Sequence, residues 1–380
     1  MLRFSHQLGP CQGIIEPAAM PVRARCASLL LAGLSLLAMP GCASKPLIPY
    51  SADSPAMILV PASLAGGKDG RVRFREIFCR IMQERGAEMP DYRPCAEALI
   101  KLPDEGPPTQ KPVDLGPSAS PFRVLVVPGV GWSCFGKFID LKGTVAEHIA
   151  RFGHDMSALQ VEALSGTARN AKLIRDAIMA MPDGDGRKRI VLIGYSKGAP
   201  DILEAVAVYS ELQDRVAAVV SAAGAVGGTP LVHDASQDTL ELLQYFPGAE
   251  CDRGDGGALE SLKPSVRQKW LVGHPLPAAI RYYSLVAHPE PEQISAVLRS
   301  SYDTLSRVDP RNDSQMIYYD QLIPGSTVLG YLNADHWAIG VPIARSHPAI
   351  ASLLVDKNAF PREALLEALM RYIEEDLRAP

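Results

Sequence analysis

The sequence has little excess charge, no metal-binding motif and no apolar run long enough to cross a membrane comfortably. It holds 38 basic and 42 acidic residues, and the resulting net charge of −4 gives no attraction to nucleic acid. It also has no His-Glu-x-x-His, no paired Cys-x-x-Cys and no glycine-rich phosphate loop followed by lysine. We therefore expect no nucleic-acid partner, no metal and no cofactor.

The most informative motif is Gly194-Tyr195-Ser196-Lys197-Gly198. It follows the apolar run 190–193 and precedes a stretch of helical periodicity at 200–212, which predicts a strand, a sharp turn and a helix. Glycine at both ends of the motif lets the strand and the helix approach each other. The motif predicts Ser196 as a nucleophile, with the backbone N–H of Lys197 as one donor of an oxyanion hole.

A serine nucleophile needs a base and an acid from elsewhere in the chain. His336 is the predicted base, because it follows the strand-like run 328–332 on a loop. His288, which ends another strand-like run, is the alternative. Asp313 is the predicted acid, because it lies between these two runs in a segment rich in turn residues, while Asp309 and Asp320 stay open.

A second oxyanion donor is expected from the loop after the strand-like run 124–127. The N–H of Val130 or Gly131 is the candidate, and Trp132 or Phe135 is expected to line the substrate pocket. This loop also resembles part of a dinucleotide fingerprint. However, it lacks the third glycine and no acidic residue ends a clean second strand, so NAD binding is excluded.

From about residue 122 to residue 377 the chain resembles an α/β-hydrolase of the esterase and lipase type. The resemblance rests on the GxSxG motif between strand and helix, the downstream His336 and the glycine loop at 129–132. It implies a Ser196-Asp313-His336 triad and an oxyanion hole from Lys197 and the glycine loop. The loop begins with Pro-Gly where many lipases have His-Gly, and a long segment, 289–308, precedes Asp313.

The alternation of strand-like and helix-like segments from 122 to 222 predicts a mostly parallel sheet with helices on both faces. We assign 122–380 to this α/β domain. Within it, 228–276 interrupts the alternation with two helical stretches, 238–245 and 258–270. We interpret this insert as a helical cap over the nucleophile, and surface decoration is the alternative.

The N-terminal segment 1–42 predicts an export signal. Arg23 and Arg25 precede a short apolar run, 27–39. Residues 1–19 have no signal character, so a translation start at Met20 is an alternative to Met1. The run ends in Pro40-Gly41-Cys42-Ala43-Ser44, which resembles a bacterial lipoprotein processing site with Cys42 as the lipidated residue. Simple cleavage near Ala43 or an uncleaved anchor is the alternative. We expect a periplasm-facing envelope protein held at the membrane by this lipid.

Segment 43–121 is predicted to be an extension with helical stretches near 73–83 and 94–100 and a linker, 103–121. The alternative is that the whole segment is a tether that holds the catalytic domain off the membrane, without a ligand of its own. Four cysteines remain beyond Cys42, an even number that suits an oxidising compartment. Cys79 and Cys95 flank a short polar segment, and a disulfide between them would join two helices of the N-terminal region. The sequence alone does not decide the pairing. Cys134 and Cys251 are the other two.

The predicted function is therefore a serine hydrolase that cleaves a carboxylic ester or lipid substrate. The same residues would serve a thioesterase or an acyltransferase. A hydrolase-like envelope lipoprotein that binds without catalysis is a third alternative, because a fold does not determine a function.

Overall fold

A sheet of eight strands organises the described part of this computed structural model, which comprises residues 67–132, 144–182, 189–233, 254–346 and 348–379. The strand order is β1-β8-β7-β6-β5-β3-β4, every neighbouring pair in it is parallel, and β2 adds an antiparallel pair with β8. The predicted, mostly parallel sheet is thus confirmed. The strands are β1 Lys68–Asp69, β2 Leu99–Ile100, β3 Phe122–Val127, β4 Asp155–Ala158, β5 Arg189–Tyr195, β6 Val216–Ala222, β7 Arg281–Ala287 and β8 Thr327–Leu332.

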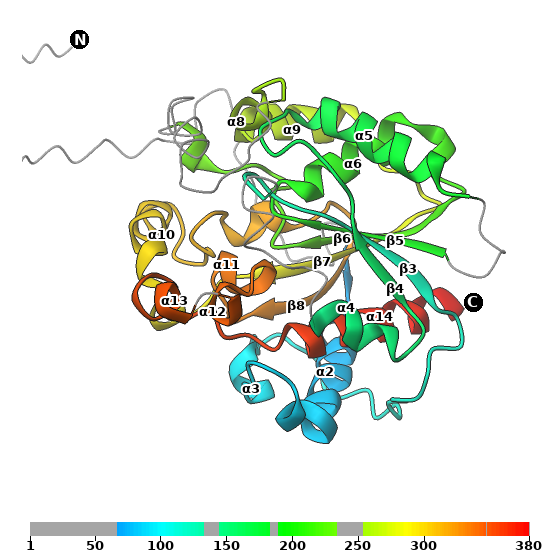
Figure 1. Cartoon of the computed structure of the whole chain (residues 1–380), viewed down its shortest axis with the longest axis vertical. Helices are drawn as coiled ribbons and strands as arrows, with labels where there is room; N and C mark the ends of the chain where they lie inside the picture. The colour runs from blue at the N-terminus through cyan, green and yellow to red at the C-terminus, as the bar shows by residue number, and fades with distance from the viewer. Residues whose placement is uncertain (1–66, 133–143, 183–188, 234–253, 347, 380) are drawn as a thin grey trace, which may run out of the picture. The chain divides into compact units, whose positions relative to one another are not determined.

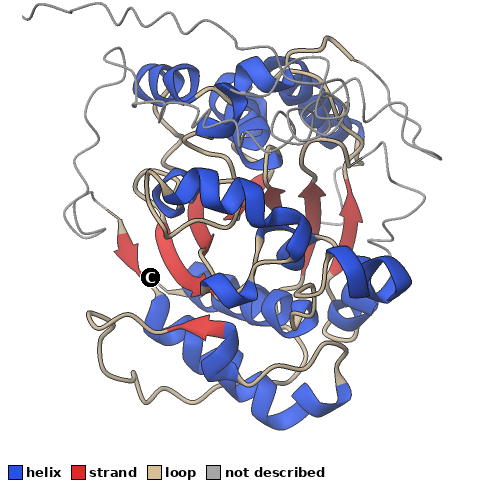
Figure 2. Cartoon of the chain, turned by 90° about the vertical axis from the view of Figure 1, so that its left-hand side faces the viewer, coloured by secondary structure: helices blue, strands red, loops and turns tan. Residues whose placement is uncertain are grey.

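Helices cover both faces of the sheet, as Figure 1 and the turned view in Figure 2 show. Alternate residues of a strand point to opposite faces, so Leu192 of β5 packs toward α5 and α6 while Ile193 packs toward α4 and α14. The helices are α2 Arg71–Arg85, α3 Cys95–Ala98, α4 Thr144–Ala150, α5 Thr167–Ala180, α6 Gly198–Val208, α8 Ala258–Ser261, α9 Pro264–Gly273, α10 Arg299–Ser306, α11 His336–Gly340, α12 Ile343–Ser346, α13 Pro348–Leu354 and α14 Arg362–Arg378.

The parallel arrangement brings four chain segments to one edge of the sheet. Strands β3, β5, β7 and β8 all end there, and residues at or next to their ends pair across the sheet, as in Val127 with Gly194 and Ala287 with Leu332. The loops that follow carry Gly129, Ser196, His288 and His336. Ligand sites of open α/β sheets form at this carboxyl edge.

The segment before β3 packs into the same core through α2, so the alternative of a simple tether does not hold for this part of the segment. Phe74 and Ile77 of α2 are fully buried in the cluster that also holds Leu369 of α14. Arg371 of α14 donates to the carbonyls of Asp114, Leu115 and Gly116, so the expected linker is held against the domain as well.

A disulfide between Cys79 and Cys95 joins α2 to the start of α3, with 5.2 Å between the two Cα atoms. It connects the two cysteines that the sequence singled out as flanking a short segment. Cys134 and Cys251 lie outside the described residues. None of the helices described in the structure is long and apolar enough to span a membrane.

The insert expected to form a cap is only partly described, because 234–253 lies outside the described residues, including the expected helix 238–245. The stretch 258–270 is two helices rather than one, since Pro264 cannot continue α8 and instead begins α9. Trp270 and Leu271 of α9 pack on the same face of the sheet as α5 and α6. Helix α9 is therefore a covering helix of the sheet, and the cap interpretation is wrong for it.

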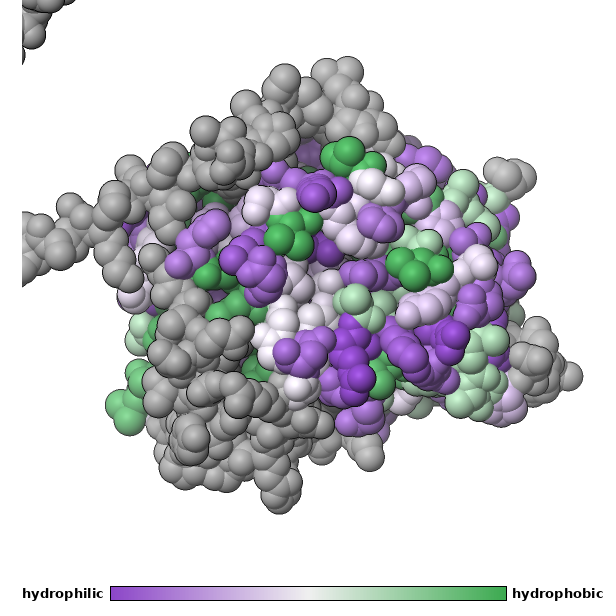
Figure 3. All heavy atoms as spheres, turned by 90° about the horizontal axis from the view of Figure 1, so that it is seen from above, coloured by the Kyte–Doolittle hydropathy of each residue, from purple (hydrophilic) through white to green (hydrophobic). Residues whose placement is uncertain are grey.

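The outer surface over this layer has separate apolar spots rather than one broad apolar patch, as Figure 3 shows from above. Val272, at the end of α9, has 88% of its surface exposed. Isolated apolar residues of this kind are ordinary on protein surfaces.

Candidate active site

The turn between β5 and α6 holds Ser196 in a left-handed backbone conformation, with φ of 56°. Such a φ is unusual for a residue with a side chain and is found at strained, functional turns. A Cβ atom at Gly198 would lie 1.9 Å from the carbonyl oxygen of Val127, and one at Gly194 would lie 2.4 Å from Cα of Ala199. Only glycine fits at either position, which is the close approach that the sequence predicted.

The loop after β3 packs directly against Ser196. A Cβ atom at Gly129 would lie 3.0 Å from Oγ of Ser196. The N–H of Gly131 donates to the carbonyl of Ala163 over a long 3.5 Å, and Gly131 itself has φ of 75°. Among the described residues the N–H of Val130 has no acceptor, so Val130 is the better candidate donor from this loop.

The predicted acid and base lie in direct contact. Oδ2 of Asp313 is 2.8 Å from Nδ1 of His336, and the backbone N–H of His336 donates to the carbonyl of Asp313 over 2.9 Å. Oδ1 of Asp313 accepts from the backbone N–H groups of Gln315 and Met316 at 2.9 and 2.7 Å. Both side chains are buried, with 0% and 4% exposed. The carboxylate is thus fixed on the imidazole, where it can select the tautomer and stabilise a positive charge.

Tyr195 supports the imidazole from the strand that carries Ser196. The Tyr195 ring stacks on the His336 ring with 4.9 Å between centroids and 24° between planes, and its hydroxyl donates to the carbonyl of His336 over 2.7 Å. A Cβ atom at Gly340 would lie 2.6 Å from the Tyr195 ring. The residue just before the nucleophile therefore holds the base loop, a role that the sequence analysis missed because this motif position has no pattern of its own.

The other acids are engaged elsewhere. Asp309 forms an ion pair with Arg311 at 2.7 Å, and Asp320 lies in the short helix Tyr318–Gln321, where its carbonyl accepts from Gly227. Asp335, next to the base, accepts from the backbone N–H groups of Ser295 and Ala338. Of the three aspartates that the sequence left open as the acid, Asp313 is the one that contacts the imidazole of His336.

His288, the alternative base, lies against aromatic rings instead of a carboxylate partner. Its ring centroid is 6.0 Å from that of Tyr318 and 5.2 Å from that of Tyr331. Burial lowers the pKa of His288 to about 4. This side chain is best understood as a buried, uncharged histidine at the end of β7.

The pKa of His288 predicts a pH dependence of stability. The unfolded chain takes up a proton near pH 6.5 and the folded protein only near pH 4, so the free energy of unfolding falls as the pH drops through this window. We expect His288→Gln to remove about 3 kcal/mol of this pH dependence. Urea unfolding at pH 7 and pH 4.5 measures it, with the exposed His233→Gln as control. Equal pH dependence in the wild type and in His288→Gln would contradict the prediction.

The Lys197 side chain forms a buried ion pair under the turn. Its ammonium lies 2.7 and 2.9 Å from the two carboxylate oxygens of Asp201, and Asn170 of α5 donates to the same carboxylate over 2.8 Å. Both ions are 1% or less exposed, and burial raises the pKa of Asp201. The pair fixes the first turn of α6, where the backbone N–H of Lys197 lies. The spacing of four residues was a signal for it in the sequence.

Two apolar surfaces adjoin the site. Val130 packs against a small cluster of Val232, Leu262 and Met316. On the opposite side an apolar cavity of about 120 Å³, which we call the α14 cavity, lies between the sheet and α14. Its lining includes Pro128, Trp132, Ile193, Tyr195, Leu365 and Leu369.

Of the two residues predicted to line the substrate pocket, Trp132 and Phe135, only Trp132 lies among the described residues. Trp132 lines the α14 cavity and meets the Tyr195 ring edge-on, with 6.1 Å between centroids. Phe135 lies outside the described residues. The described residues contain no group of three or more histidine, cysteine or acidic side chains placed to hold a metal ion.

Comparison with known proteins finds similar solved structures. The metagenomic carboxyl esterase MGS0156 is similar with a TM-score of 0.81 and 40% sequence identity, over 87% of this chain and 100% of that chain. The mature form of the Bacillus licheniformis lipase BlEst2 is similar with a TM-score of 0.48 and 18% identity, over 64% of this chain and 95% of that chain. No family model and no curated protein matches the sequence.

Proposed function

Because this chain belongs to the α/β-hydrolase family of carboxylesterases, we propose that it hydrolyses carboxylic esters through an acyl enzyme formed on Ser196. The observation that carries the proposal is the Asp313 and His336 pair, 2.8 Å apart, at the sheet edge where the strained Ser196 turn emerges. The chain order of serine, aspartate and histidine is the order of this fold.

In the proposed mechanism, Oγ of Ser196 attacks the ester carbonyl while Nε2 of His336 takes the hydroxyl proton. Asp313, held by two backbone N–H groups, stabilises the imidazolium that forms. The N–H groups of Lys197 and Val130 donate to the oxyanion. The alcohol leaves with the proton from His336, and water activated by the same imidazole then releases the acid and restores Ser196.

Labelling with a fluorophosphonate probe tests the activated serine. We expect one covalent adduct, which mass spectrometry of the digested protein locates on the peptide that contains Ser196. A folded protein that gains no adduct, or gains it on another residue, would contradict the proposal.

We further propose that the chain is exported and lipidated at Cys42, facing the periplasm from a bacterial envelope membrane. The support is the signal-like pattern of residues 1–42, which lie outside the described residues, together with the Cys79–Cys95 disulfide, since such bonds persist in oxidising compartments. Metabolic labelling with a radioactive fatty acid should mark the full-length protein and not Cys42→Ala. Unlabelled full-length protein would contradict this proposal.

A further inference from the structure

The proposed base, His336, follows a short connection between the end of β8 and α11. Asn333 is the first residue of this connection, and both of its backbone groups are bound by the segment around β2. Its N–H donates to the carbonyl of Ala98 over 2.9 Å, and its carbonyl accepts from Nη1 of Arg93 over 2.5 Å. The direction in which the chain leaves β8 is therefore set by residues that lie before β3.

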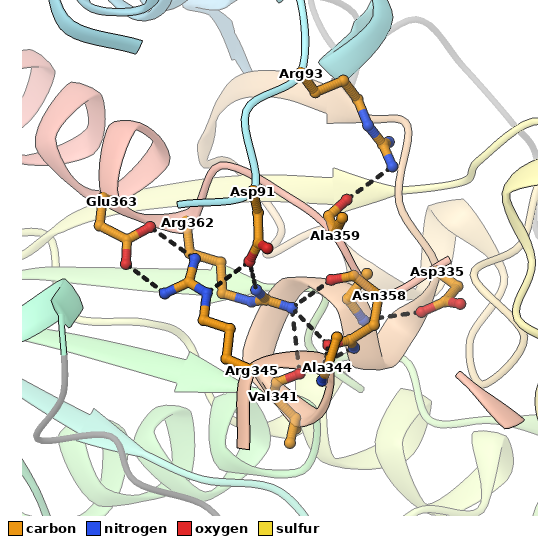
Figure 4. A network of polar contacts seen from close by, with 11 residues as sticks. Asp91, Arg93, Asp335, Val341, Ala344, Arg345, Asn358, Ala359, Arg362 and Glu363 are labelled. Carbon is orange, nitrogen blue, oxygen red and sulfur yellow. Dashed lines mark hydrogen bonds and ion pairs between the residues drawn. The ribbon is translucent and has the colours of Figure 1, made fainter. Parts of the chain in front are cut away.

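Arg93 is itself held in one place by further contacts. Its Nη2 donates to the carbonyl of Ala359 over 2.8 Å, as Figure 4 shows, and to Oε1 of Gln293 over 3.2 Å. The guanidinium also lies over the ring of Phe360, 5.8 Å from the ring centroid. Arginine holds five N–H donors in a rigid fork, so one side chain can join several segments. Arg93 thus joins the connection before His336 to the loop before α14.

The other end of α11 is reached from the same segment through Arg362. Asp91 accepts from Nη1 of Arg362 over 2.9 Å, and Nη2 of Arg362 donates over 3.2 Å to the carbonyl of Val341, the residue after α11 (Figure 4). Asn358 donates to the same carbonyl over 2.9 Å. We call segment 91–98 the base clamp, because it binds the chain before α11 directly and the chain after α11 through one side chain.

The Cys79–Cys95 disulfide fastens the base clamp to α2. Cys95 lies two residues after Arg93 and three before Ala98, so it stands between the two residues that bind Asn333. Cys79 lies on α2, whose buried face belongs to the core of the domain. A disulfide removes freedom from the loop that it closes. This one therefore limits the positions that Arg93 can take relative to the end of β8.

The carbonyl of Asn333 lies where water has little access, since the residue is only 8% exposed. A buried carbonyl that loses its donor is costly, so without the Arg93 guanidinium this peptide gains stability by turning toward water. Such a turn shifts His336, three residues later. In an active site a displacement of about 1 Å can lower the rate about 10²-fold.

We propose that Arg93 is a positioning residue for the base and that the Cys79–Cys95 disulfide keeps it in position. Arg93 fixes Asn333 and, through it, the place of His336. The rate of ester hydrolysis then depends on a segment before β3, outside the serine, acid and base themselves. This inference rests on the proposed ester hydrolysis at Ser196 with His336 as base.

Arg93→Met tests the inference, because it keeps an unbranched apolar stem and removes the N–H donors. We expect kcat for p-nitrophenyl acetate to fall about tenfold, with KM within about twofold of the wild type, because His336 serves both the acylation and the deacylation step. The rate of labelling by a fluorophosphonate should fall by a similar factor. Wild-type kcat in the folded variant, or a raised KM with unchanged kcat, would overturn the inference.

Arg73→Met is the matched control. Arg73 also lies before β3 and also donates to two backbone carbonyls, those of Lys111 and Pro112, over 2.8 Å each. It forms an ion pair with Glu375 at 2.7 Å. We expect this variant to lower the unfolding temperature and to keep the wild-type kcat. Equal losses of kcat in the two variants would indicate a general loss of structure and overturn the inference.

The double variant Cys79→Ser, Cys95→Ser tests the role of the disulfide. We expect it to lower kcat about threefold by itself and to lower the kcat of Arg93→Met no further, because the disulfide acts on the rate through Arg93. Losses that multiply, or wild-type kcat in the folded double variant, would overturn this role. Where the double variant does not fold, Arg93→Met and its control still decide the inference.

The outcomes separate this inference from the proposed function. Fluorophosphonate labelling of Ser196 in the wild type, together with wild-type kcat in Arg93→Met, would overturn the positioning role alone. Ester turnover without any adduct on Ser196 would overturn the proposed function and, with it, this inference.

Discussion

Ser196→Ala is expected to lower kcat for ester hydrolysis by about 10⁴-fold to 10⁶-fold, because the change removes the hydroxyl on which we propose that the acyl enzyme forms. The change removes one oxygen from a half-buried side chain and leaves the backbone of the turn as it is. The unfolding temperature is therefore expected to stay close to that of the wild type. Initial rates with p-nitrophenyl acetate measure the loss.

Ser300→Ala is the matched control, since Ser300 is an exposed serine on α10. It should keep the wild-type rate and the wild-type labelling by a fluorophosphonate. Turnover by Ser196→Ala within tenfold of the wild type would refute the assignment of the nucleophile.

Asp313→Asn is expected to lower kcat by about 10⁴-fold with little change in stability. An amide at this position can accept the same two backbone N–H groups through its oxygen but presents an NH₂ group to Nδ1 of His336. The imidazole would then hold its proton on Nε2, where the base must be free. Part of the lost rate should return at high pH, where hydroxide can take over the role of the base.

Asp309→Asn is the control for Asp313→Asn, because it also removes one negative charge but leaves the contact between Asp313 and His336 in place. Asp309 is a buried aspartate four residues earlier that is paired with Arg311 rather than with His336. We expect it to affect stability more than kcat. Equal losses of kcat in Asp309→Asn and Asp313→Asn would remove the basis for the assignment of Asp313.

The parts of the site that the sequence could predict are those with a local signal. The strand, turn and helix around Ser196 follow from an apolar run, two glycines and helical periodicity, and the structure has them at Arg189–Tyr195 and Gly198–Val208. His336 and Asp313 followed from chain order, and the structure brings them within 2.8 Å. The i, i+4 pair of Lys197 and Asp201 was within reach of the same reasoning.

The features that the sequence analysis did not predict depend on contacts between segments that are far apart in the chain. Strands β1 and β2 have two residues each, too few for an alternation of apolar and polar residues, so nothing local marks them as members of the sheet. The stacking of Tyr195 on His336 joins residues 141 positions apart. The α14 cavity arises from the packing of the last helix on the sheet, and the periodicity of the sequence does not predict such a cavity.

The position of β1 and β2 has a consequence for how this protein can be divided. The side of β8 that faces away from β7 is paired with β1 over Thr327 and Val328 and with β2 over Tyr331 and Leu332. A protein shortened to begin at Phe122 would leave that side as an open row of backbone donors and acceptors, ready to join a strand of another molecule. A shortened protein that keeps this side of β8 paired therefore starts no later than Lys68, well before the first strand of the hydrolase motif.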